Sequence, residues 1–103
     1  MQDLLDIEQL HEQTFHDADI RHDVLGMFQQ QVPLLLAAMQ AGTDQQRADL
    51  AHRLTGSCLA IGARPLAAAA AVVEQEPANM AALGDVERLL DATLRTIAEF
   101  LAA

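Results

Sequence analysis

The hydrophobic residues of this chain recur three and four positions apart, which is the spacing of helices with one buried face. Capping residues, glycines and prolines divide this pattern into five segments. We expect helices over residues 7–15, 20–41, 43–61 and 65–76, and a last helix that ends at residue 103. The last helix starts either near Asn79 or after Gly84. No segment reads as a strand, so the prediction is an all-α fold, an antiparallel four-helix bundle with a short additional N-terminal helix, in a single domain over residues 1–103.

Local signals mark where these helices begin and end. Asp6 can cap the first helix, and Thr43 with Gln46 three residues later forms the pattern of a capping box for the third. Gly62 suits the C-terminal end of that third helix. Pro33 lies inside the second helix and removes a backbone donor there, so we expect this helix to kink or to split.

The composition indicates a small intracellular domain with an aliphatic core. Hydrophobic residues make up 51% of the 103 residues, but aromatic residues only 3%. The single cysteine, Cys58, cannot form an internal disulfide, and no secretory signal opens the chain, so we expect a cytoplasmic protein. The longest apolar run, residues 66–73, is far shorter than the ~20 residues that a membrane span needs. We therefore expect no direct insertion into a membrane.

The charge of the chain argues against nucleic acid or an anionic membrane as its partner. Fifteen acidic residues stand against six arginines, with no lysine, and the net charge is −9. Residues 1–23 hold seven acidic residues and one arginine, a net charge of −6. Residues 45–64 hold Arg47, Arg53 and Arg64 and one aspartate, a net charge of +2. The sequence thus predicts one locally basic segment in an acidic protein.

A histidine in this basic segment is predicted to lie on the exposed face of the third helix. At about 100° per residue, Leu50, Leu54 and Ile61 share one stripe, with Cys58 close to it. This stripe is the expected core face. His52 points almost directly away from it, so its imidazole should be exposed, whereas Cys58 is expected to be a buried small residue.

The surface around His52 has the features expected of a docking site. Ala48 and Thr55 flank the histidine on one side, and Gly56 leaves the next turn without a side chain. Leu59 falls about 20° from His52 and should be an exposed apolar residue. An alternative for Gly56 is that it allows close helix packing, but its position away from the core stripe favours access to the imidazole.

The turn after the third helix brings an acidic residue level with the histidine. Antiparallel helices joined by a tight turn place residues equidistant from that turn at the same height, and Ala63 is the midpoint between His52 and Glu74. Glu74 is therefore a candidate to accept a hydrogen bond from His52 Nδ1, which would leave Nε2 free as a nucleophile. The alternative from geometry alone is an ordinary surface glutamate near a helix end.

The run from Ala51 to Ala63 closely resembles the signature of histidine-containing phosphotransfer (HPt) domains. The residues that meet the family pattern are His52, Leu54, Gly56, Ser57, Cys58, Gly62, Ala63, Leu66 and Glu74. The resemblance implies a phosphoryl carrier rather than a turnover enzyme. The phosphoryl group would pass from an aspartate of a receiver domain to His52 Nε2 and then to a second receiver. It also implies no cofactor in this chain, because the receiver brings the divalent metal.

One residue departs from the family pattern. Thr55 stands where HPt domains usually have a lysine, and Arg53 is a candidate substitute for that cation, or else a solvated arginine. The alternative function is a non-phosphorylated adaptor bundle that binds receivers or other partners through the same face. The expected partners are receiver domains of a hybrid sensor kinase or a response regulator, and the expected state is a monomer.

A metal site is not predicted. His11 and His16 are five positions apart, about 140° around a helix, whereas the paired ligands of a zinc helix lie four apart on one face. A metal or haem bundle would need ligands that point inward, and His52 points outward.

Overall fold

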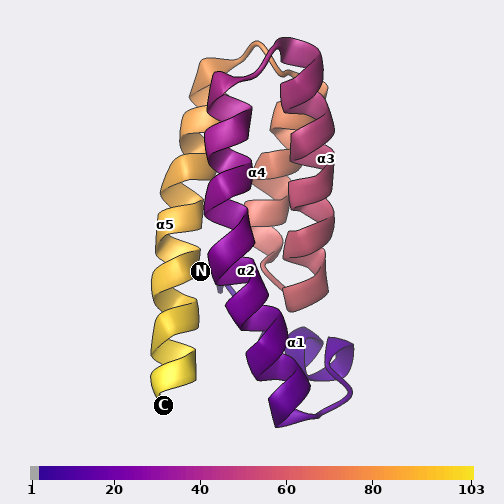
Figure 1. Ribbon diagram of the computed structural model, residues 1–103, viewed down its shortest axis with the longest axis vertical. Coiled ribbons are helices and arrows are strands. Elements are labelled where there is room, and N and C mark those ends of the chain that lie inside the picture. The colour runs from indigo at the N-terminus through magenta and orange to yellow at the C-terminus, as the bar shows by residue number, and fades with distance from the viewer. Residues whose placement is uncertain (1–2) are drawn as a thin grey trace.

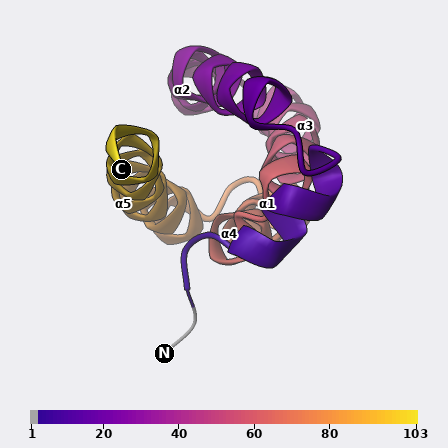
Figure 2. The same cartoon turned by 90° about the horizontal axis from the view of Figure 1, so that it is seen from below.

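The computed structural model describes residues 3–103, which form five helices and no strand (Figure 1). The helices are α1 (Ile7–Gln13), α2 (Ala18–Ala41), α3 (Asp44–Ile61), α4 (Arg64–Gln75) and α5 (Met80–Ala102). Helices α2 to α5 run alternately up and down, and α1 lies across the lower end of α3. Seen along the bundle, α2, α3, α4 and α5 follow one another around an arc (Figure 2). The all-α prediction, four bundle helices and a short N-terminal one, is confirmed.

Most predicted helix ends are present. The Thr43 side chain accepts the Gln46 backbone N–H, and the Gln46 side chain accepts the N–H of Thr43, so the capping box is complete. Gly62 ends α3 in the left-handed region with φ of 78°. Asn79 caps α5 by accepting the Ala82 N–H, which decides between the two predicted starts.

Two boundaries between α1 and α2 were predicted wrongly. Helix α1 ends at Gln13 rather than at Phe15, because Phe15 and His16 turn into the left-handed region with φ of 54° and 55°. Helix α2 begins at Ala18, two residues earlier than expected, because the Asp17 side chain accepts backbone N–H groups of the first turn.

Helix α2 continues through Pro33, so the predicted alternative of a split is excluded. Pro33 is exposed, while buried residues on both sides of it, Phe28 and Val32 before and Met39 after, pack into the same core. That shared burial keeps the helix continuous although Pro33 has no backbone N–H to donate.

The core is aliphatic and is filled from all four bundle helices. Its large, fully buried members include Leu25 and Met39 of α2, Leu54 of α3, Leu66 of α4 and Ile97 of α5. The alanine run of α4 alternates in burial: Ala67 and Ala70 are buried, and Ala68 is exposed. These small buried residues let α4 pack closely against its neighbours. Among residues 3–103, none of the helices combines the length and apolar character needed to cross a membrane.

Helix α1 is tied to the turn between α3 and α4. The Asp6 N–H donates to the Gly62 carbonyl at 2.8 Å, and Gln9 Nε2 donates to the Leu59 carbonyl at 2.9 Å. Arg64 Nε donates to Gln9 Oε1 at 2.7 Å. These bonds give the Gly62 carbonyl a donor and add a second donor to the Leu59 carbonyl, which also accepts the Gly62 N–H.

Candidate functional site

Helix α3 presents His52 to solvent. The buried residues of this helix are Arg47, Ala51, Leu54, Cys58 and Ile61, which form one stripe along it. Leu50, expected in that stripe, is only partly buried, because the buried side of α3 is centred nearer to Ala51 than the sequence suggested. The His52 side chain lies opposite the stripe and is 76% exposed.

The structure brings His52 and Glu74 together. His52 Nδ1 lies 2.8 Å from Glu74 Oε1 and 3.3 Å from Oε2. A carboxylate accepts hydrogen bonds, so the contact favours the tautomer in which the proton is on Nδ1 and the Nδ1–H group donates a hydrogen bond to Glu74. Nε2 then holds the free lone pair, and within residues 3–103 it makes no hydrogen bond. In this tautomer the outer nitrogen of the ring can act as a nucleophile.

His52 and Glu74 line an open depression on the surface between α3 and the end of α4. Its other lining residues are Gln45, Ala48, Asp49, Arg53 and Pro77. Gln45 Nε2 donates to Asp49 Oδ1 at 3.0 Å, so this carboxylate already has a partner. Arg53 makes no hydrogen bond or ion pair with any described residue. Its guanidinium is thus available to an anion placed beside the histidine.

The predicted patch around the histidine contains one open backbone position and one exposed apolar side chain. A Cβ built on Gly56 would have no atom within 4 Å, which contradicts the alternative that this glycine serves close helix packing. Leu59 is 47% exposed. Thr55 is partly buried, and its hydroxyl donates back to the Ala51 carbonyl at 2.9 Å, away from the exposed face.

Comparison with known proteins identifies the family. A family model described as the Hpt domain matches residues 23–100, which is most of the chain. The chain belongs to the Hpt domain family. No individual curated protein and no solved structure shows significant similarity to it. Membership supports a role in two-component signalling, where Hpt domains interact with receiver domains in phosphorelays.

The basic segment predicted around His52 is not a basic patch in three dimensions. Arg47 is buried, with 6% exposure, and binds backbone carbonyls. Arg64 lies at the other end of α3, where it bonds Gln9 and lies 3.6 Å from Asp6. Of the three arginines, only Arg53 lines the depression that contains His52. The net charge of +2 for residues 45–64 was counted correctly, but these charges do not form one basic surface, because Arg47 and Arg64 make structural contacts.

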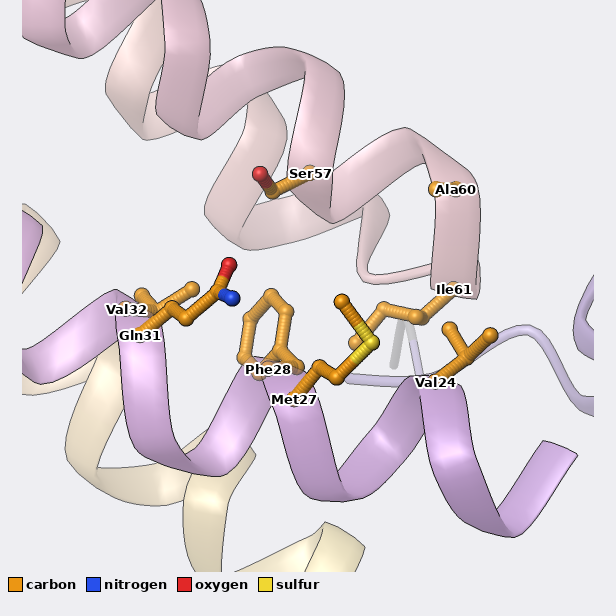
Figure 3. A pocket seen from close by; sticks show the side chains of 8 residues that line it. All are labelled: Val24, Met27, Phe28, Gln31, Val32, Ser57, Ala60 and Ile61. Atoms are coloured by element: carbon orange, nitrogen blue, oxygen red, sulfur yellow. The ribbon is translucent and has the colours of Figure 1, made fainter.

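An apolar groove that the sequence analysis did not anticipate runs between α2 and α3 of the Hpt domain. Figure 3 shows Met27 and Phe28 of α2 lying between that helix and Ser57, Ala60 and Ile61 of α3. Met27 is 54% exposed although it is a large apolar residue of α2. The signal in the sequence that could have indicated an exposed apolar face is the spacing of Met27 and Leu34, which lie two turns apart on one helix.

This groove continues to the histidine. Gln31 and Ser57 line the groove and also a second depression, which Arg53 shares. Arg53 in turn lines the depression around His52. A partner that covers His52 can therefore reach the groove across one continuous surface.

The structure offers no cluster of metal ligands within residues 3–103. The His11 and His16 rings stack with their centroids 6.0 Å apart, and Arg21 Nη1 lies 3.1 Å from His11 Nδ1. The arginine therefore occupies one of the nitrogens that a metal would need.

Proposed function

We propose that this Hpt domain carries a phosphoryl group on His52 Nε2, between the aspartate of one receiver domain and that of another. The observation that carries the proposal is the 2.8 Å contact between His52 Nδ1 and Glu74, with the histidine side chain 76% exposed. The contact orients the ring and directs the nucleophilic nitrogen outward. The domain acts as a carrier, since its own contribution is a nucleophile and a docking surface.

In the proposed transfer step one bond to phosphorus forms as another breaks, and no further reactant is consumed. The Nε2 lone pair attacks the phosphorus of the receiver's aspartyl phosphate, the Nε2–P bond forms, and the bond from phosphorus to the aspartate oxygen breaks. The aspartate leaves as a carboxylate. The Nδ1 proton stays on the ring, and the Glu74 carboxylate offsets the positive charge that develops there. The receiver supplies the divalent metal, and the reverse step delivers the group to a second receiver.

Arg53 is the residue that we assign to the phosphoryl oxygens. Thr55, at the position where the family pattern has a lysine, directs its hydroxyl to the Ala51 carbonyl and has no cation to offer. Arg53 lines the same depression as His52 and has no partner among the described residues. Its planar guanidinium suits two phosphoryl oxygens at once.

The docking surface that we propose surrounds the histidine. Gly56 provides clearance, and Ala48, Thr55 and Leu59 are the flanking contacts. The groove beside Met27 extends this surface with apolar contact area. We propose that the receivers belong to a hybrid sensor kinase or a response regulator, and that a monomer meets them in the cytoplasm.

Incubation with phosphorylated receiver domains tests the proposal. The wild-type chain should become an acid-labile phosphoprotein, and His52→Gln should not. His16→Gln is the matched control, because His16 is also exposed but lies at the α1–α2 turn. A wild-type protein that binds receivers without becoming labelled would instead support a non-phosphorylated adaptor. The observation in favour of that alternative is that Thr55 stands where the family pattern has a lysine.

A further inference from the structure

Arg47 is a buried arginine at the start of α3, five residues before the histidine. Its Nε donates to the Met39 carbonyl at 2.8 Å and its Nη2 to the Gly42 carbonyl at 2.8 Å, both at the end of α2. Its Nη1 donates to Asp44 at 3.0 Å and to the Pro77 carbonyl at 2.9 Å. One guanidinium thus joins the end of α2, the start of α3 and the segment that follows α4.

The end of α4 needs such an anchor. Glu76 leaves the helix with φ of −131° and ψ of 66°, and no basic residue lies in the last turn. Pro77 follows, three residues after Glu74, and it lines the same depression as His52 and Glu74. The bond from Arg47 to the Pro77 carbonyl is a side-chain link between α3 and this segment.

The contact between His52 and Glu74 is too exposed to hold the two helices by itself. The two side chains are 76% and 36% exposed, and exposed pairs contribute little to stability. Charge-assisted bonds to buried carbonyls are stronger and directional. Core packing holds α4 up to the fully buried Val73, one residue before Glu74. The bond from Arg47 to the Pro77 carbonyl holds the chain three residues after Glu74, where the helix has ended.

We propose that Arg47 is a positioning residue for His52: by binding the Pro77 carbonyl, it keeps Glu74 at the height where its carboxylate meets Nδ1. The proposal rests on the proposed function for its effect on transfer. The proposed control of the His52 tautomer by Arg47 does not depend on the proposed function. A misplacement of about 1 Å is enough to cost a large part of a rate that depends on orientation.

The test measures both halves in Arg47→Met, Glu74→Ala and the double variant. Nitrogen-15 NMR of the imidazole reports which ring nitrogen carries the proton, and labelling by a phosphorylated receiver reports transfer. Arg47→Met should shift protonation from Nδ1 towards Nε2 and slow transfer about tenfold. In the Glu74→Ala background the same substitution should have no further effect on either measurement, because the residue through which it acts is gone.

Arg64→Met is the matched control, since Arg64 anchors α1 at the opposite end of α3 and should leave the tautomer unchanged. If Arg47→Met does not fold, Arg47→Lys decides, because lysine keeps the charge but lacks the fork that reaches several carbonyls. A folded Arg47 variant with the wild-type tautomer overturns the proposal, and so does an undiminished additional loss in the Glu74→Ala background. If neither the wild type nor any variant is phosphorylated, the proposed function is wrong, and the tautomer measurement still tests the role of Arg47.

Discussion

Replacing Gly56 with alanine adds one methyl group to α3 at a point where no atom lies within 4 Å of the added carbon. Glycine inside a helix is less favourable than alanine by about 1 kcal/mol. The structure adds no steric penalty, so Gly56→Ala should raise the free energy of unfolding by roughly 0.5–1 kcal/mol. In a chain of this size, that raises Tm by about 2–8 °C.

The same methyl group should impair transfer. Gly56 lies four residues after His52, one turn along on the same face of the helix, so a receiver that reaches the imidazole must pass over it. Overpacking a fitted interface by a methyl group costs about 1–3 kcal/mol. Since about 1.4 kcal/mol corresponds to a factor of ten, transfer from a receiver should fall by about fivefold to a hundredfold.

Circular dichroism melts and transfer from a phosphorylated receiver measure the two effects, and a small-molecule phosphoryl donor separates docking from chemistry. Gly26→Ala is the matched control, because Gly26 lies inside α2, also has no atom within 4 Å of an added Cβ, and does not line the groove. It should melt higher and transfer normally. A more stable Gly56→Ala protein that transfers at the wild-type rate would refute the reasoning, as would equal slowing with the small donor.

Other substitutions test the contacts around the site. Gly62→Ala should lower the free energy of unfolding by roughly 2–4 kcal/mol in urea titrations, because Gly62 has φ of 78° and its added Cβ would lie 2.7 Å from the Asp6 carbonyl oxygen; an unchanged midpoint would contradict this. Burial raises the pKa of the Cys58 thiol from 9.0 to about 12, so it should resist thiol reagents at pH 8 unless the protein unfolds. Because the unfolded thiol ionises first, the stability that the neutral thiol contributes is present below pH 9.0 and is lost as pH rises towards about 12; a flat stability profile there would count against burial. Arg53→Ala should slow transfer about tenfold while Arg53→Lys keeps most of the rate, and equal rates for all three proteins would remove Arg53 from the proposed mechanism.

The local signals of the sequence were sufficient for most of the fold. Thr43 with Gln46, and Gly62, act through hydrogen bonds and backbone angles within a few residues, so their positions in the sequence predict where α3 begins and ends. The sequence predicted a break after residue 15, but it placed Phe15 in the helix, because residues such as Phe15 and His16 rarely adopt a positive φ.

The central pair of the site also followed from the sequence. Helical periodicity placed His52 opposite the core, and the mirror relation about Ala63 placed Glu74 at about the same height, because a tight turn between antiparallel helices brings residues equidistant from it to the same level. The chemistry assigned to the pair remains a proposal that the receiver experiment tests.

What the sequence could not determine was the environment of individual charged and apolar residues. Arg47 was counted as part of a basic patch, but its partners are carbonyls of Met39, Gly42 and Pro77, which come together only when α2, α3 and the segment after α4 are packed. Met27 is a large apolar residue of a helix with one buried face, but the neighbouring helices leave it exposed beside a groove. A helix determines which direction a side chain points, whereas the packing of helices from distant parts of the chain determines what it meets there.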